Sequence, residues 1–331
     1  MEENKINHQM EINENYYYPL QTLSLEDTLK NINEERVKFY DYLSSANKVN
    51  KFTLFGFLAV LLIFLVSLLL NKENVNELFP PLMLVFVVFL IVSYFLVKNT
   101  KKRKNIAFDG YKKEYFLNID SYCYYQTGIS NLAFSYNSIV EKEAIEKIGC
   151  YENIIKTVTR DVVVGKMFGT AFTSYDLLLK SGKNISDESD HQVLFSGKMF
   201  YFDLPIKQDG KMFIYLKGCG DSHPTELEGL DKISIKGLKD DYLVFSSIKA
   251  NNVISKKAIE VLNQIQIDQV IEDVIISISN QGIFFGISLT KEYMTIPFEN
   301  EVKEDYLKHY KNDIENIKTF ISVLMSNKNY Q

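Results

Sequence analysis

Cysteine is scarce in this chain of 331 residues. Its three cysteines, Cys123, Cys150 and Cys219, lie far apart, and no two of them form a CxxC pair. An odd and scattered set supplies neither a disulfide framework nor a zinc site, and it is typical of a reducing compartment. We therefore interpret the cysteines as partly buried free thiols that behave as small apolar side chains.

Positive charge is also in short supply. The formal net charge is −5, which argues against a general nucleic-acid-binding protein, because binding to phosphates needs a basic surface. Only three of the 37 basic residues are arginine, namely Arg36, Arg103 and Arg160. A coding bias toward lysine and asparagine would explain that ratio, so we draw no functional conclusion from it.

The short motifs of common active sites are missing as well. There is no H-E-x-x-H, no G-x-S-x-G, no kinase set and no dinucleotide fingerprint. The segment Gly218–His223 gathers a thiol, a carboxylate, a hydroxyl and an imidazole, but Cys–His chemistry normally draws its two side chains from different elements. The acidic run Asp187–His191 lacks the spacing of a calcium loop. We expect no catalytic, cofactor-binding or metal-binding residue and no cofactor.

Two long apolar runs dominate the first hundred residues. Phe52–Leu70 has 19 residues and Leu78–Val97 has 20, and neither contains a charged side chain. As helices, each would be about 30 Å long, which matches the hydrocarbon core of a bilayer. Buried helices of soluble proteins rarely reach this length without charge. The sequence therefore predicts a transmembrane hairpin over residues 52–97.

The residues around these runs indicate an orientation. The first run follows a largely polar segment of 51 residues, nine of them acidic, so it is not a cleavable signal. The short connection Asn71–Glu77 makes the helices antiparallel neighbours. Lys48 and Lys51 precede the first run, and five basic residues follow the second: Lys98, Lys101, Lys102, Arg103 and Lys104. The positive-inside rule then places both termini in the cytoplasm, at the cell inner (plasma) membrane. The same five residues suit contact with anionic lipid headgroups, and both interpretations stay open.

The segment before the first run divides into two parts. Residues 1–21 are polar and rich in Asn and Glu, and we expect them to lack fixed structure. Within residues 22–51, Ser24 with Asp27 can cap an amphipathic helix that leads to the membrane. We favour packing of its apolar stripe on protein over contact with the bilayer surface.

Residues 98–331 read as one α+β domain. Helices are expected at 106–119 with an interruption at Gly110, from Ser138 to Gly149, from Ser255 onward and at 302–325. Strands are predicted at residues 162–164, 168–179, 193–204, 211–217, 232–235, 242–247, 274–279 and 283–289. Runs of strands beside helices favour a mainly antiparallel sheet with flanking helices.

Three stretches resemble a bacterial family of membrane-anchored proteins, domain-of-unknown-function family 3137. They are Thr159–Asp176, Phe195–Phe200, and Tyr242–Ser246 followed by the helix from Ser255 and the hairpin at 274–289. The family has a Ser-Glu-like pair in the first stretch. Here Tyr175 intervenes and Asp176 stands for the glutamate. The resemblance covers residues 23–325 and implies a bacterial inner-membrane protein with a cytoplasmic domain, without an established activity or catalytic residues.

The leading functional hypothesis is a membrane-anchored cytoplasmic binding or scaffold module that contacts a protein partner. A homo-oligomer through the apolar runs is a further option, because Gly56 and Ala59 offer a small-residue face. The alternative is an enzyme that acts on a membrane-proximal substrate through an unrecognised active site. A deep pocket joining Asp176, His191 or His223 would favour that alternative.

Overall fold

The computed structural model describes residues 18–70, 75–135, 140, 145–146, 148–149, 151, 154–182, 191–216, 226–265, 271–289, 296, 300–327 and 329–330. The chain forms two compact units. We call Leu29–Tyr115 with Pro297–Val302 the hairpin unit. The sheet unit comprises Met1–Thr28, Phe116–Ile296 and Lys303–Gln331. Each unit is described by itself.

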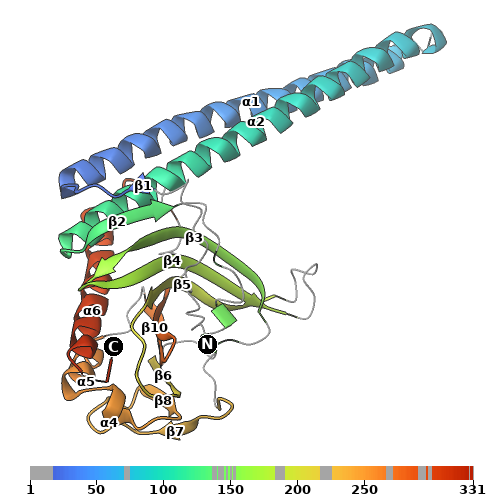
Figure 1. Ribbon diagram of the computed structural model, residues 1–331. Helices are drawn as coiled ribbons and strands as arrows, with labels where there is room; N and C mark the ends of the chain where they lie inside the picture. The colour runs from blue at the N-terminus through green and yellow to red at the C-terminus, as the bar shows by residue number, and fades with distance from the viewer. Residues whose placement is uncertain are drawn as a thin grey trace, which may run out of the picture. The chain divides into compact units, whose positions relative to one another are not determined.

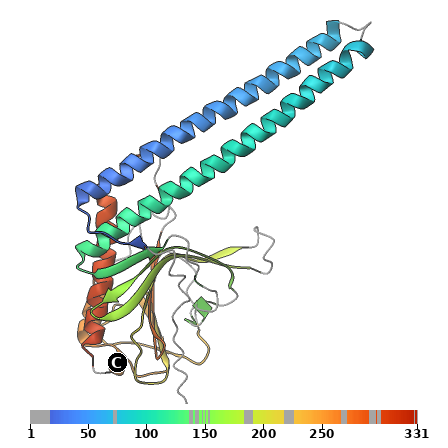
Figure 2. The ribbon, with the colours of Figure 1, turned by 45° about the horizontal axis from the view of Figure 1, so that its top comes forward.

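Two long helices make up most of the hairpin unit. Helix α1 spans Leu25–Leu70 and helix α2 spans Val75–Gln126, and they lie side by side and antiparallel (Figures 1 and 2). Both are long and apolar enough to cross a membrane, as predicted, and no residue of the most apolar 18-residue window of either helix is buried. Helix α2 begins at Val75, three residues before the predicted apolar run, so Pro80 and Pro81 lie beyond its first turn.

Aromatic rings join the two apolar runs to each other. The rings of Phe57 and Phe64 each lie 6.0 Å from that of Phe86. A Cβ atom added at Gly56 would lie 3.2 Å from the ring of Phe89. Gly56 therefore serves the packing of α1 against α2, and this contact uses the small-residue face that we considered for a homo-oligomer.

The helices continue well past the apolar runs. Ser24 caps α1 as predicted, because its Oγ accepts a hydrogen bond of 3.0 Å from the Asp27 N–H. Phe39 is buried and stacks on Tyr111, with ring centroids 5.7 Å apart, so the apolar stripe of α1 packs on α2. The predicted interruption at Gly110 is wrong. Helix α2 passes through it, and the roughly 1 kcal/mol cost of a helical glycine is too small to end so long a helix.

The sheet unit is built on a ten-stranded sheet in which all neighbours pair antiparallel, so the predicted α+β class and strand direction are confirmed (Figure 1). The strand order is β1-β2-β3-β4-β5-β10-β9-β6-β8-β7. The strands are β1 (Tyr18–Pro19), β2 (Ser130–Ser135), β3 (Ile154–Met167), β4 (Thr170–Ser181), β5 (Gln192–Phe202), β6 (Lys211–Leu216), β7 (Asp231–Ile233), β8 (Tyr242–Ser246), β9 (Ile271–Ser279) and β10 (Gly282–Leu289).

Strands β1 and β2 were not predicted. Strand β1 pairs with β2, with Tyr18 opposite Phe134 and Pro19 opposite Ala133. The expectation that residues 1–21 lack fixed structure is therefore wrong for Tyr18 and Pro19, because pairing on β2 fixes a polar segment that has no apolar pattern of its own. Residues 1–17 lie outside the described part of the chain.

Within the described residues, the sheet unit also contains the end of α2 and the helices α4 (Ala250–Val253), α5 (Lys256–Leu262) and α6 (Glu304–Met325). Ser255 caps α5 as predicted, accepting a hydrogen bond of 3.2 Å from the Ala258 N–H. Helix α6 packs on the sheet through Phe320, whose ring centroid lies 5.8 Å from that of Phe285 on β10 (Figure 1). Most of the helix expected from Ser138 to Gly149 lies outside the described residues.

Candidate functional site

The five basic residues singled out from the sequence lie on α2, just beyond its apolar run. Lys98, Lys101, Lys102, Arg103 and Lys104 are all exposed. Phe39 lies against Phe108, and Gly56 lies against Phe89. Lys48 and Lys51 lie between Phe39 and Gly56 on α1, so antiparallel packing puts them at the level of the five. We call these seven residues the basic collar.

The sequence-predicted enzyme pocket finds no support among the described residues. Asp176 lies in the middle of β4 and His191 lies just before β5. Asp176 is the cross-strand partner of Lys198. Lys198 follows His191 by seven residues, which is about 20 Å along a strand, so Asp176 and His191 do not meet. His223 and Cys219 lie outside the described residues, as do Asp187, Glu188 and Asp190. Where the structure describes the chain, no three His, Cys, Asp or Glu side chains are placed to hold a metal ion.

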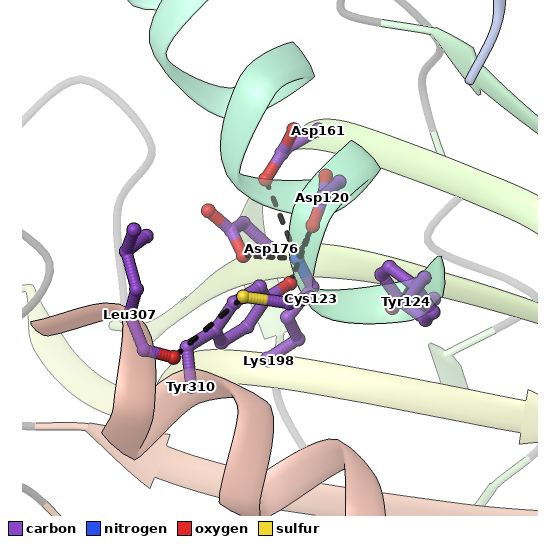
Figure 3. Close-up of polar contacts among 9 residues, drawn as sticks. Asp120, Cys123, Tyr124, Asp161, Asp176, Lys198, Leu307 and Tyr310 are labelled. Atoms are coloured by element: carbon purple, nitrogen blue, oxygen red, sulfur yellow. Dashed lines mark hydrogen bonds and ion pairs between the residues drawn. The ribbon is translucent and has the colours of Figure 1, made fainter. Parts of the chain in front are cut away.

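The structure instead brings together a buried charged cluster inside the sheet unit (Figure 3). Its centre is the Lys198 ammonium on β5, which is 4% exposed. The Lys198 Nζ lies 3.3 Å from Asp120 Oδ1, 3.3 Å from Asp161 Oδ2 and 3.6 Å from Asp176 Oδ1. None of the three carboxylates is more than 8% exposed. We call these four residues with Tyr310 the Lys198 cluster.

Strand pairing places two of the acids. Asp176 lies directly opposite Lys198 on adjacent strands, so their side chains point to the same face. The register between β3 and β4 shifts between Arg160 and Val163, which marks a bulge. Asp161 occupies that bulge with φ of 62°. In a regular register the residue after Arg160 would point away from the face of Asp176, so the bulge is what brings Asp161 to the ammonium.

Helices supply the remaining members from above the sheet. Asp120 lies in the last two turns of α2, and Tyr310 lies in the second turn of α6. The Tyr310 hydroxyl donates a hydrogen bond of 2.6 Å to Asp120 Oδ1. The Lys198 Nζ also lies 4.7 Å from the centre of the Tyr310 ring, a cation–π distance. Five elements of the fold thus meet at one ammonium.

Burial and charge set the protonation of the cluster. Burial alone would lower the pKa of Lys198, but the carboxylates of Asp120, Asp161 and Asp176 outweigh it and raise that pKa well above its usual value. Burial, followed by the charge of Asp120, raises the pKa of Asp161 well above its ordinary range. Lys198 is therefore charged, and the environment of Asp161 disfavours its ionised form.

Neighbouring groups close the cluster off with further polar contacts. The Tyr124 hydroxyl and the Ser174 Oγ share a hydrogen bond. Cys123 is fully buried, and its thiol lies 3.7 Å from the carbonyl oxygen of Leu307. Burial raises the pKa of the Cys123 thiol, so this cysteine is an inert free thiol, as expected. Cys150 and Cys219 lie outside the described residues.

The arrangement can do two things chemically. It can tie α2, β3, β4, β5 and α6 together, and it can hold a proton. A cluster this buried offers no contact to a substrate in water.

Comparison with known protein families, with characterised proteins and with solved structures finds no match to this chain.

Proposed function

We propose that this protein is a membrane-anchored binding or scaffold module, in which α1 and α2 cross the bilayer and the sheet unit contacts a protein partner. One observation carries the proposal. In the part of the chain that the structure describes, the apolar runs leave large side chains uncovered: Phe52 is 81% exposed and Leu62 is 64% exposed, and the most apolar windows of both helices contain no buried residue. Lipid is the solvent in which such a surface is stable.

The basic collar supports the orientation with both termini in the cytoplasm, at the inner (plasma) membrane. Its seven cations come from two helices but lie at one level of the hairpin, beside the apolar runs. Lys98 also folds toward Tyr94, with Nζ 5.6 Å from the ring centre, a pairing typical of the membrane–water interface. Attraction to anionic headgroups would come from these same residues.

The buried state of the Lys198 cluster supports a binding module over an enzyme. Catalysis on a membrane-proximal substrate would need polar groups that a substrate can reach, and this cluster lies under α2 and α6. The enzyme alternative would have to use other residues. The resemblance to domain-of-unknown-function family 3137 remains a prediction that agrees with an anchored domain.

Cysteine labelling in intact cells tests the membrane topology. Glu73→Cys lies between α1 and α2, and Gln331→Cys lies at the chain end, each in a full chain whose Cys150 and Cys219 are replaced by serine. A membrane-impermeant maleimide should label position 73 from outside and position 331 only after the inner leaflet is opened. Labelling of position 331 in intact cells would reverse the orientation, and extraction of the chain by alkaline carbonate would refute the anchor.

Cross-linking in native membranes tests the partner. The full chain is the bait, and a chain lacking residues 105–331 is the control. A stoichiometric partner held only by the full chain supports a binding role for the sheet unit. Recovery of the protein alone would remove the basis for a protein partner and would promote the enzyme alternative.

A further inference from the structure

We propose that the Lys198 cluster is a proton-binding site, which holds one proton on the Asp161 carboxyl at neutral pH, so that the sheet unit loses stability as the pH rises toward the point where this proton is released. This inference does not depend on the membrane topology or on a partner. It follows from the geometry of five residues that the sequence does not bring together.

The first step is charge balance. Three carboxylates surround one ammonium within 3.6 Å, and all four side chains are buried. Asp120 and Asp161, both 1% exposed, each lie 3.3 Å from this single ammonium. Ionisation of both would leave one negative charge in excess in the protein interior, where burying an ion costs several kcal/mol even after relaxation. Among the described residues, no three His, Cys, Asp or Glu side chains are placed to hold a metal ion, and Lys198 occupies the point where the carboxylates converge. A proton is the cation small enough to enter.

The second step locates the proton. Asp120 Oδ1 already receives hydrogen bonds from Lys198 and from Tyr310. Asp120 Oδ2 and Asp161 Oδ1 are buried and find no hydrogen-bond donor among the described residues. One proton on Asp161 provides a donor where both oxygens now have none. Burial and the nearby charge of Asp120 act in the same direction, since they raise the pKa of Asp161.

The third step considers every titratable group in and around the cluster. The members of the cluster are Asp120 on α2, Asp161 on β3, Asp176 on β4, Lys198 on β5 and Tyr310 on α6, and Cys123 and Tyr124 on α2 lie beside them. Burial raises the pKa of Cys123, Tyr124 and Tyr310 above their usual alkaline values, and the pKa of Lys198 is raised as well. These four groups keep their protons through the neutral range, which leaves the carboxyls as the source of any change there.

The direction of the pH effect follows from the raised pKa. Below about pH 4, both the folded and the unfolded chain carry the Asp161 proton. Above that pH the unfolded chain releases it, while the folded chain keeps it up to its own higher pKa. The unfolding equilibrium constant therefore increases about tenfold per pH unit across this window, so stability is lost as the pH rises.

Asp161→Asn is the sharpest variant, because an amide copies the neutral carboxyl and asparagine tolerates a positive φ. Denaturant unfolding of the full chain in detergent micelles is followed from pH 5 to pH 9. Asp240→Asn, at an exposed position, is the control. We expect the unfolding equilibrium constants of the wild type and of the control to increase with pH, relative to that of Asp161→Asn, by up to tenfold per pH unit. At the upper end of the range, Asp161→Asn should be the most stable of the three proteins.

Two outcomes would overturn the proposal. If Asp161→Asn is less stable than the wild type and the difference in free energy of unfolding grows with pH, Asp161 is ionised and acts only as an ion-pair partner. Equal pH slopes in all three proteins would mean that no proton is held. If Asp161→Asn does not fold, infrared spectroscopy of the wild-type full chain decides. A carboxylic-acid band must be present at pH 7 and must disappear as the pH is raised, and its absence refutes the site.

Discussion

The hairpin unit and the sheet unit place charge in opposite ways. Along the apolar runs of α1 and α2, large apolar side chains are exposed and no charged residue occurs, and the basic collar lies just beyond the runs. The sheet unit buries its apolar side chains and also encloses an ammonium and three carboxylates. The first pattern fits a lipid solvent, and the second is stable in water only while every buried charge keeps its partners.

The largest effect is expected from removing the buried ammonium of Lys198 in the sheet unit. Lys198→Met removes the ammonium that contacts Asp120, Asp161 and Asp176. We expect a loss of about 3–5 kcal/mol in the free energy of unfolding, because buried carboxyls lose the ammonium that they share. Denaturant titration of the full chain in micelles measures it.

Lys308→Met is the matched control for this change, since Lys308 is an exposed lysine on α6 that pairs with Glu304 and Asp305. We expect it to leave the unfolding midpoint unchanged. Equal effects of the two substitutions would show that the buried pairs contribute no more than surface ones.

The second-largest effect is expected from placing a charged side chain in the uncharged apolar run of α1. Leu62→Asp, at an exposed position near the centre of the first apolar run, should cost about 2.5–3.5 kcal/mol of membrane insertion. An insertion assay with glycosylation tags reports it. Val37→Asp, exposed on the part of α1 before the run, should insert like the wild type. Normal insertion of Leu62→Asp would contradict a lipid-facing surface.

The third test compares one glycine from each unit. A Cβ at Gly197 on β5 would lie 1.9 Å from the Ile287 carbonyl oxygen, whereas one at Gly110 on α2 meets nothing within 4 Å. We expect Gly197→Ala to destabilise the protein by about 1–3 kcal/mol. Gly110→Ala should stabilise it by about 0.5–1 kcal/mol. Unfolding midpoints measured side by side test both, and the same sign for both would conflict with the described packing.

The smallest effect concerns the start of α1. Ser24→Ala removes the cap that accepts from the Asp27 N–H and should cost about 1 kcal/mol. Hydrogen exchange of the first turn should become faster while the apolar run is unaffected. Ser45→Ala, an exposed position inside the same helix, should not increase that exchange. If it does, capping is not the cause.

Much of the fold could be predicted because its signals are local. The uncharged runs of α1 and α2, the Ser24 and Ser255 caps and the apolar strands each depend on neighbouring residues alone. Strand β1 has only two residues and no apolar pattern, so its pairing with β2 could not be read from the sequence. The bulge at Asp161 also leaves no local signal, because it depends on the register of β3 against β4.

The candidate site could be predicted only in part. Asp161, Asp176 and Lys198 lie in the stretches that carry the family resemblance, and an ionisable residue in an apolar strand such as β5 is a usable signal. Asp120 and Tyr310 come from helices 190 residues apart. Only tertiary packing decides that they reach Lys198, so their contribution could not be found from spacing.

The pairing of β1 with β2 has a practical consequence. Strand β1 precedes α1 in the chain and β2 follows α2, so the long stretch of the hairpin unit is an insertion within the sheet unit rather than an extension at one end of it. A single cut in the connection between α1 and α2 would leave both halves attached to the sheet. Any soluble fragment that begins after Gln126 would lose Asp120 together with the edge strand.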